Sequence, residues 1–346
     1  PVHPVARVGL VQTQVSAEAK GDPTRAVEAT RQQLRELGFG DGAGSLGDPE
    51  LLVWPETTFP FPVSSRSDVV RNLVESASAE EDAPLLFGAL ESAGDSPGAE
   101  YNAAFLFRPR RDGSGELRSV YRKRFLVPVV ERAPRLLPEF LPLPGRLLEA
   151  VGAGRGEGVA GRGGARDEAT EGRGELSAGE VGDPVLLPGP SSAESGSRPG
   201  ADSRFGVLIC FESAFPGASR EYRRAGADFL VNVTNDVWFG EDTWLPTRAG
   251  AEQHAAHVVM RAVENRIGVA RSANGGSTFF VDPVGRIHGR APAGDAAVTV
   301  GTVSGSRVLT LYARTGDWIG PGSLGAVLVL LLAGVARRRF GRSSTR

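Results

Sequence analysis

Three polar side chains that could take part in covalent chemistry each come after a predicted strand of this sequence. Glu56 comes just after Leu51–Trp54, Cys210 follows Phe205–Ile209, and Lys123 lies beyond another predicted strand. Apolar runs of this length are typical of strands buried in a layered sheet. Because sites in α/β proteins form at the carboxyl ends of strands, the three positions are candidates for one site.

A thiol, a carboxylate and an ammonium group together suit acyl transfer without histidine. A cysteine thiol is only weakly ionised at neutral pH, so it needs a base such as Glu56 before it attacks. An ammonium group such as that of Lys123 stabilises the oxyanion of a tetrahedral intermediate. Taken singly, each residue also has a plain interpretation. Cys210 alone could be a small buried side chain, Glu56 a loop carboxylate and Lys123 a solvated surface charge.

The elements that must position these residues alternate between strand and helix, which predicts an α/β layered fold. One helix start is marked by Asp22 as N-cap and Pro23 at the first helical position. The predicted strands are Val5–Val15, Leu51–Trp54, Pro84–Leu90, Tyr101–Phe107, Leu117–Tyr121, Phe205–Ile209, Ala227–Thr234, Gly268–Ser272, Thr278–Val281 and Ala297–Val303. The predicted helices begin at Asp22 and span Asp68–Glu80, Pro216–Ala225 and Thr247–Asn265.

Composition restricts the function classes. The 346 residues are 40% hydrophobic and 23% charged, with a formal net charge of -2, so no basic field favours nucleic acid as a partner. A single cysteine excludes an internal disulfide framework. His254 and His257 share a helix face but lack a third ligand, so we interpret them as a solvated face. No glycine-rich phosphate loop occurs, and we expect neither a metal nor another cofactor.

Residues 150–203 differ in composition from the rest of the chain. Gly, Arg, Glu, Ala and Ser dominate, and such a segment buries too little apolar surface to offset its ordering entropy. We expect a flexible insertion within one catalytic domain spanning residues 5–310. The apolar piece Pro184–Pro188 is the part expected to touch the body of that domain.

Residues 319–336 carry no charge and are rich in Leu, Val, Ala and Gly. About 18 residues at roughly 1.5 Å each reach about 27 Å, near the thickness of a hydrocarbon core. Trp318 precedes this run and Arg337–Arg339 follow it. The pattern predicts a transmembrane helix with a basic cytoplasmic tail at 337–346, and the catalytic domain on the opposite side of the membrane. The alternative is a buried core helix with a basic tail.

The order of three motifs resembles a known signature. Trp54–Thr57 (WPET), Tyr121–Pro128 (YRKRFLVP) and Cys210–Glu212 (CFE) resemble the Glu-Lys-Cys signature of the nitrilase, or carbon-nitrogen hydrolase, superfamily. Within it, the chain resembles the bacterial apolipoprotein N-acyltransferase family. The stretches that carry this narrower resemblance are Thr234–Gly240, Arg261–Asn265, Asn274–Gly276 and Leu311–Trp318.

The resemblance implies an αββα sandwich and a role for each residue. Glu56 is implied as general base, Lys123 as oxyanion stabiliser and Cys210 as nucleophile. Supporting or substrate-binding positions are implied at Glu131, Glu212, Phe211, Trp238 and Asn102. Two departures from the family pattern occur. Arg132 replaces an aromatic residue beside Glu131, and Phe211 stands where tyrosine is frequent.

The resemblance also implies substrates. A phospholipid would donate an acyl chain to Cys210 as a thioester, and the N-terminal amine of a diacylglyceryl-cysteine apolipoprotein would accept it. The implied place is the bacterial inner membrane, with the catalytic domain on the periplasmic side. Because the family's N-terminal membrane helices are missing and the chain starts at Pro1, we expect a fragment of a longer protein. The alternatives are a nitrilase-like amidase that hydrolyses a small amide and a membrane-tethered binding module.

Overall fold

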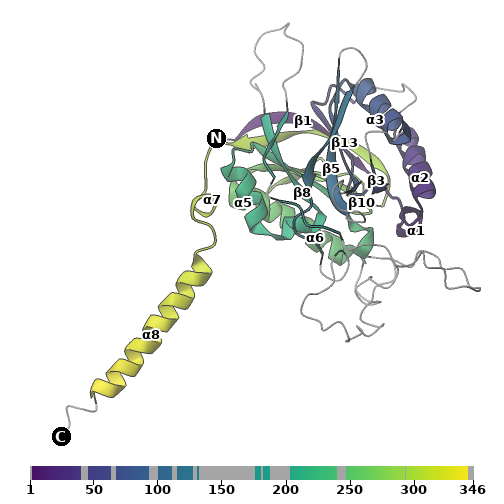
Figure 1. Cartoon of the computed structure of the whole chain (residues 1–346). Coiled ribbons are helices and arrows are strands. Elements are labelled where there is room, and N and C mark those ends of the chain that lie inside the picture. Colours follow the sequence, from purple (N-terminus) through teal and green to yellow (C-terminus); the bar gives the residue numbers. More distant parts are fainter. Residues whose placement is uncertain are drawn as a thin grey trace, which may run out of the picture.

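Two β-sheets lie face to face at the centre of the fold, with helices on their outer faces (Figure 1). The computed structural model describes residues 2–39, 46–63, 68–92, 100–110, 115–127, 131, 176–180, 182–187, 203–239, 247–292 and 294–341. The side chains of Trp238 and of residues 247–248 and 335–341 lie outside this description.

The first sheet has the order β13-β1-β2-β4-β5-β6, and β3 pairs with β4. Its strands are β1 (Val2–Gln12), β2 (Leu51–Val53), β3 (Phe59–Pro62), β4 (Leu85–Ser92), β5 (Glu100–Pro109), β6 (Gly115–Arg122) and β13 (Ala297–Ser306). β1, β2 and β4 run parallel, so the chain segments that follow them leave the sheet at one edge. Glu56 lies in the segment after β2.

The second sheet has the order β12-β11-β10-β9-β8-β7. Its strands are β7 (Val185–Leu187), β8 (Ser203–Ile209), β9 (Phe229–Asn235), β10 (Gly268–Asn274), β11 (Phe279–Val281) and β12 (Ile287–His288). β8, β9 and β10 are parallel and buried along nearly their whole length, which explains their unbroken apolar sequences. Cys210 directly follows β8.

Helices complete the layers. α2 (Pro23–Glu36) and α3 (Asp68–Glu81) cover the first sheet, while α5 (Pro216–Arg224) and α6 (Thr247–Asn265) cover the second (Figure 1). As predicted, Asp22 caps α2, and its carboxylate accepts from the backbone N–H groups of Thr24 and Arg25 at 2.8 and 3.1 Å. The remaining helical elements are α1 (Ala17–Lys20), the 3₁₀ turns η3 (Cys210–Ala214) and η4 (Asp236–Phe239), α7 (Leu311–Thr315) and α8 (Ile319–Gly341).

Two hydrophobic clusters hold the layers together. The larger one fills the space between the sheets and extends to α5 and α6, with Leu10, Leu106, Ile209 and Phe229 among its fully buried members. The smaller one packs α2 and α3 against the first sheet around Trp54. The predicted αββα sandwich is therefore confirmed.

The two sheets are joined at the edge where the parallel strands end. Thr13, just past β1, forms a parallel bridge with Asn274 at the end of β10. The backbone N–H of Thr13 donates to the Ala273 carbonyl at 3.2 Å, and that of Gly275 donates to the Thr13 carbonyl at 2.9 Å. This junction fixes the carboxyl ends of strands from both sheets at one place.

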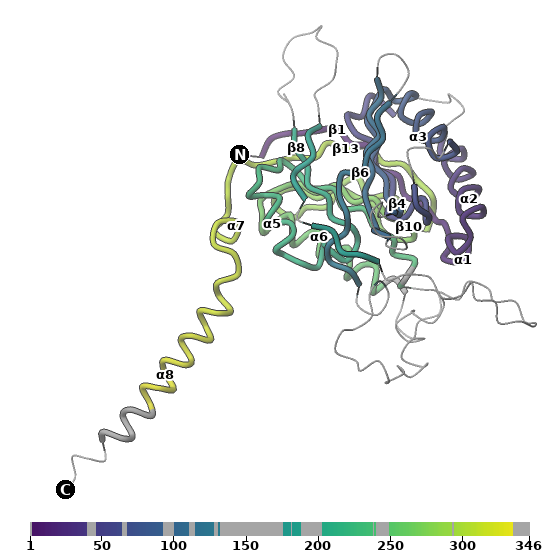
Figure 2. The backbone as a smooth tube through the Cα atoms, viewed as in Figure 1, coloured from purple at the N-terminus to yellow at the C-terminus, as the bar shows by residue number. Residues whose placement is uncertain are grey.

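The C-terminal helix α8 corrects one expectation. β1 begins beside the end of β13, where the chain turns to α7 and to α8, which extends away from the sandwich (Figure 2). Leu330 and Leu332 of α8 are 72% and 69% exposed, so the alternative of a buried core helix is wrong. Among the described residues, no helix combines the length and the apolar character that a membrane span needs. The transmembrane helix predicted at 319–336 is therefore not found; that prediction rested on an uncharged run at the short limit for a span.

Most of the insertion predicted at 150–203, and residues 342–346 of the predicted tail, lie outside the described residues. Two described pieces of the insertion contact the body. β7 pairs antiparallel with β8, as expected for Pro184–Pro188. The backbone N–H of Ser177 donates to the Glu100 carbonyl and that of Gly179 to the Lys123 carbonyl, both at 2.8 Å. The second piece thus lies directly on the segment that carries Lys123.

The backbone around Glu56 depends on a glycine in the neighbouring strand. A Cβ on Gly88 would lie 2.5 Å from the Glu56 Cα and 2.6 Å from the Thr57 nitrogen. We expect Gly88→Ala to lower the free energy of unfolding by about 1–3 kcal/mol, because one backbone must move. Denaturant titration measures this. Gly217→Ala, which meets nothing within 4 Å, serves as the control, and equal effects of the two changes would contradict the account.

Candidate active site

Glu56 lies in a tight turn after β2 and is 3% exposed. The next residue, Thr57, has a left-handed backbone with φ 47°. Both oxygens of the Glu56 carboxylate accept hydrogen bonds from buried groups. Oε1 accepts from Lys123 Nζ at 3.1 Å and from Asn102 Nδ2 at 2.8 Å. Oε2 accepts from the backbone N–H of Asn235, the last residue of β9, at 2.8 Å. The turn of one sheet is therefore bound to a strand end of the other.

Lys123 follows β6 and its side chain is 1% exposed. Its ammonium donates to Glu56 Oε1 at 3.1 Å and to Glu131 Oε1 at 2.7 Å. Burial alone would lower the pKa of this lysine, but the negative charges of Glu56 and Glu131 outweigh burial and raise it. Lys123 is therefore a cation throughout the neutral range.

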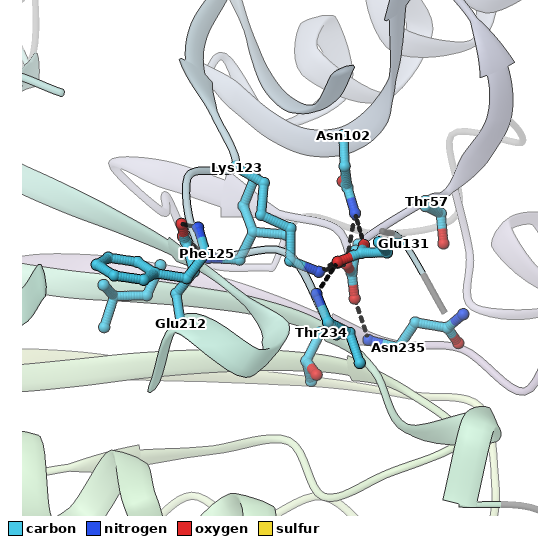
Figure 3. Close-up of polar contacts among 12 residues, drawn as sticks. Thr57, Asn102, Lys123, Phe125, Glu131, Glu212, Thr234 and Asn235 are labelled. Atoms are coloured by element: carbon cyan, nitrogen blue, oxygen red, sulfur yellow. Dashed lines mark hydrogen bonds and ion pairs between the residues drawn. The ribbon is translucent and has the colours of Figure 1, made fainter. Parts of the chain in front are cut away.

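Glu131 forms the other side of this cluster (Figure 3). Its Oε2 accepts from the backbone N–H of Val127 at 2.7 Å. Its Oε1 shares the two donors of Glu56 Oε1, since it accepts from Lys123 Nζ at 2.7 Å and from Asn102 Nδ2 at 3.1 Å. Two carboxylates thus hold one ammonium and one amide between them, and the four predicted residues lie together.

Cys210 starts the 3₁₀ turn after β8 with φ 49°, a conformation that costs energy in a residue with a Cβ. Burial raises the pKa of its thiol, and the charge of Glu56 raises it further, while the charge of Lys123 acts in the opposite direction. The structure therefore brings Cys210 within electrostatic reach of both residues. At neutral pH the group is a thiol, so its attack requires a base.

Glu212, two residues after Cys210, is fully buried. Its Oε1 accepts from the Tyr121 hydroxyl at 2.7 Å and from the backbone N–H groups of Arg124 and Phe125 at 2.7 and 3.2 Å. Its Oε2 accepts from the backbone N–H of Ile209 at 2.8 Å. Glu212 thereby binds the segment after Lys123 to the turn of Cys210.

The two remaining predicted residues are aromatic. Phe211 is half-buried and packs edge-on against Phe215, with ring centroids 5.1 Å apart. Phe215 in turn stacks on Phe125 at 4.3 Å. The three rings form a partly exposed apolar wall next to Cys210. Trp238 lies in η4, but its side chain is outside the described residues, so its predicted role stays a prediction.

Sequence reasoning missed a buried ion network after β9. Asp236 Oδ2 accepts from Arg271 Nη2 at 2.6 Å, and its Oδ1 lies 2.9 Å from His254 Nδ1 and accepts from the Thr234 hydroxyl at 2.9 Å. His254 is 5% exposed, so its assignment to a solvated face was wrong. Burial would raise the pKa of Asp236, but Arg271 and His254 outweigh it and lower the pKa. The sequence signal was the polar run Thr234–Asp236 at a strand end.

The arrangement places a protonated thiol within electrostatic reach of a carboxylate and of a fixed ammonium group. These are the parts needed for nucleophilic acyl transfer with a stabilised oxyanion. Within the described ranges, no group of three or more His, Cys, Asp or Glu side chains is arranged to hold a metal ion.

Comparison with known proteins shows which family the chain belongs to. A family model described as Carbon-nitrogen hydrolase matches residues 7–310. The chain belongs to the carbon-nitrogen hydrolase family. Among solved structures, a carbon-nitrogen hydrolase from Helicobacter pylori G27 has a TM-score of 0.52 at 14% identity, covering 87% of this chain and 89% of that one. An amidase from Nesterenkonia sp. has a TM-score of 0.52 at 16% identity, covering 93% and 97%. These two likenesses concern the fold alone.

Curated relatives are more specific. An apolipoprotein N-acyltransferase of Chlorobaculum tepidum is 33% identical over 356 residues, which cover 97% of this chain and 58% of that protein. One of Geobacter metallireducens is 31% identical over 312 residues, covering 90% and 50%. The chain thus spans about half the length of these relatives. As predicted, this member of the carbon-nitrogen hydrolase family is similar to apolipoprotein N-acyltransferases.

The change Glu212→Gln tests whether this carboxylate positions the site. The amide would turn an N–H₂ group toward one of the four donors that now bind carboxylate oxygens. We expect a loss of about 1–3 kcal/mol in the free energy of unfolding, together with slower acylation of Cys210. The matched change Glu221→Gln removes an exposed partner of Arg124 and should alter stability by less than about 1 kcal/mol. Full stability of Glu212→Gln in a thermal melt would refute this role.

The reactivity of the thiol tests the electrostatics. Burial raises the pKa of Cys210, the charge of Glu56 raises it further and that of Lys123 lowers it. Iodoacetamide reacts with thiolate that is already present, so its rate follows the pKa of Cys210. Glu56→Gln should therefore speed alkylation at pH 8, and Lys123→Met should slow it. Each unit of pKa change corresponds to about a tenfold change in thiolate while the thiol form dominates. Cys210→Ala gives the background, and alkylation rates that do not differ between the variants would contradict the assignment.

Proposed function

We propose that this protein transfers an acyl chain from a phospholipid to the N-terminal amine of a diacylglyceryl-cysteine apolipoprotein. The observation that supports this most directly is the buried cluster of Glu56, Lys123 and Glu131 facing the turn of Cys210. The substrate class follows from the names of the relatives that the chain resembles. Glu56 acts as general base, Lys123 as oxyanion stabiliser and Cys210 as nucleophile.

In the first half-reaction, the Cys210 thiol gives its proton to Glu56 as its sulfur attacks the ester carbonyl of the lipid. The oxyanion that forms faces the ammonium of Lys123. The carbon–oxygen bond of the ester then breaks, and Glu56 returns the proton to the leaving alcohol. The products are a thioester on Cys210 and a lysophospholipid. Glu131 and Asn102 keep the ammonium and Glu56 in place while charge moves.

In the second half-reaction, the amine of the acceptor attacks the thioester and Glu56 takes one of its protons. Collapse of the intermediate breaks the carbon–sulfur bond, and the Cys210 thiolate regains a proton from Glu56. An amide is formed and the thiol is restored. No cofactor enters the scheme, because each proton has a carboxylate to receive it.

Membrane contact is part of the proposal. The exposed apolar side chains of α8, with Leu328, Leu330 and Leu332 all at least 51% exposed, would lie against lipid. The aromatic wall of Phe125, Phe211 and Phe215 would line the path of an acyl chain to Cys210. The bacterial inner membrane and its periplasmic face as the location stay predictions from the sequence.

Amide hydrolysis is the second candidate, favoured by the match to the carbon-nitrogen hydrolase family over residues 7–310. The same acyl-enzyme would then form from an amide and be resolved by water. The two functions share every residue of the cluster and differ in the second substrate.

Intact mass spectrometry distinguishes them. We expect protein mixed with phosphatidylethanolamine vesicles to gain the mass of one acyl chain, removable by hydroxylamine as a thioester, and Cys210→Ala to gain none. Glu56→Gln should acylate at least about 100-fold more slowly, since a general base contributes this much. Ammonia release from acetamide, without an adduct from lipid, would instead establish the amidase. An equal adduct on Cys210→Ala would refute both.

A further inference from the structure

Both lysines of this chain contact the same short segment. Lysine and arginine together number 39, yet only Lys20 and Lys123 are lysines. Lys123 binds the Glu56 carboxylate, as described above. Lys20 binds the backbone of the same turn, because its Nζ donates to the Glu56 carbonyl oxygen and to the Thr57 hydroxyl, each at 3.3 Å. In a chain that otherwise uses arginine for positive charge, this coincidence requires an explanation.

The turn that Lys20 contacts is conformationally demanding. Thr57 has φ 47°, and a threonine in the left-handed region costs free energy that neighbouring contacts must offset. On its other side the turn lies against Gly88, which leaves no room for a side chain. Lys20 therefore supplies hydrogen bonds on the side of the turn that faces α1, and the turn directs the carboxylate of Glu56.

Lys20 is itself held by the framework. It is the last residue of α1, which starts at the N-cap Ser16. The residues before α1 are fixed by Asn274, whose Oδ1 accepts from the Val15 N–H and whose Nδ2 donates to the Val15 carbonyl, both at 2.9 Å. Asn274 Nδ2 also donates to Asn235 Oδ1 at 2.8 Å. The backbone N–H of Asn235 binds Glu56 Oε2. A closed ring of contacts thus runs from α1 through Glu56 and back.

A lysine suits this position better than an arginine. The contacts converge on one nitrogen from a carbonyl and a hydroxyl, which a compact ammonium satisfies better than a planar guanidinium. Lys20 is partly buried. Burial lowers its pKa to about 7, and the charge of Glu56 acts against this decrease. The positive form of Lys20 therefore depends on the residue that it helps to place.

We propose that Lys20 is a positioning residue for the general base, holding the Glu56–Thr57 turn so that the carboxylate reaches Cys210. The inference rests on the proposed function only in taking Glu56 as the base for acylation of Cys210. It does not depend on which acyl donor or acceptor the protein uses.

The test measures the burst of p-nitrophenol when p-nitrophenyl butyrate acylates Cys210, a reaction that needs no lipid. We expect Lys20→Met to lower the acylation rate by about 10- to 100-fold, the cost of a base displaced by a fraction of an ångström to about 1 Å. The ester concentration for half-saturation should stay within about twofold of wild type. Lys20→Arg, which keeps the charge and its donors, should recover part of the rate. The control is Arg25→Met, which removes an exposed cation that pairs with Glu18 of α1.

Several results would overturn the inference. A Lys20→Met rate within about twofold of wild type would show that the contact is dispensable. A changed half-saturation with an unchanged rate would make Lys20 a substrate-binding residue. Equal rates for Lys20→Met and Lys20→Arg would point to lost packing alone. If Lys20→Met does not fold, Lys20→Gln takes its place in the comparison with Lys20→Arg. The glutamine side chain is polar but lacks the charge and the length of lysine. A wild-type burst without acylation by phospholipid vesicles would reject the proposed function. The burst rates of the Lys20 variants would still test this inference, because the ester assay needs no lipid.

Discussion

The rest of the site depends on one buried ammonium group. Lys123 is almost completely removed from water, and a charge in that position costs several kcal/mol unless it is paired and hydrogen-bonded. Glu56 and Glu131 provide the pairing, and Asn102 binds both carboxylates. Burial and the charge of Glu56 together keep the neighbouring Cys210 a thiol. The same electrostatics that stabilise the fold thus make the proposed nucleophile dependent on a base.

The sandwich is what brings these charges together. Glu56 and Lys123 follow strands of one sheet, whereas Cys210 and Asn235 come from the other. The bridge between Thr13 and Asn274 and the hydrogen bonds of Glu212 fix these elements across the interface between the sheets. Left-handed backbones at Thr57 and Cys210 store strain at the two turns that carry the proposed base and the proposed nucleophile, and this strain persists only because the surroundings are rigid.

Much of this could be predicted from the sequence, for physical reasons. Buried parallel strands give unbroken apolar runs, and polar residues just beyond them indicate a site, so the local pattern predicts Glu56 and Cys210. Lys123 follows the antiparallel and only partly buried strand β6, and its prediction depends on the motif Tyr121–Pro128. Contacts between distant segments leave no such pattern. Lys20 ends a helix of four residues, too short to give a periodic signal, and its partners lie about 36 residues along the chain. His254 was misassigned because its buried partner, Asp236, lies 18 residues earlier in the chain, and the sequence does not show that the two residues meet.

The C-terminal helix shows a different limit. Its existence follows from composition, but the same uncharged run fits a membrane, a partner or a core, and the sequence cannot choose among them. Glu212 is a related case. The motif around Cys210 marks Glu212 as a candidate site residue. Only the structure shows that the four hydrogen bonds of Glu212 hold two segments together.

The central claim is that Cys210 carries the acyl group and passes it to an amine. A single-turnover chase tests this directly, with protein acylated by phospholipid, freed of excess lipid and mixed with a synthetic diacylglyceryl-cysteine peptide. The account predicts that the acyl mass leaves Cys210 at a rate set by the peptide concentration and appears on the peptide as an amide. Release of free fatty acid at a rate independent of the peptide, with no amide formed, would contradict it.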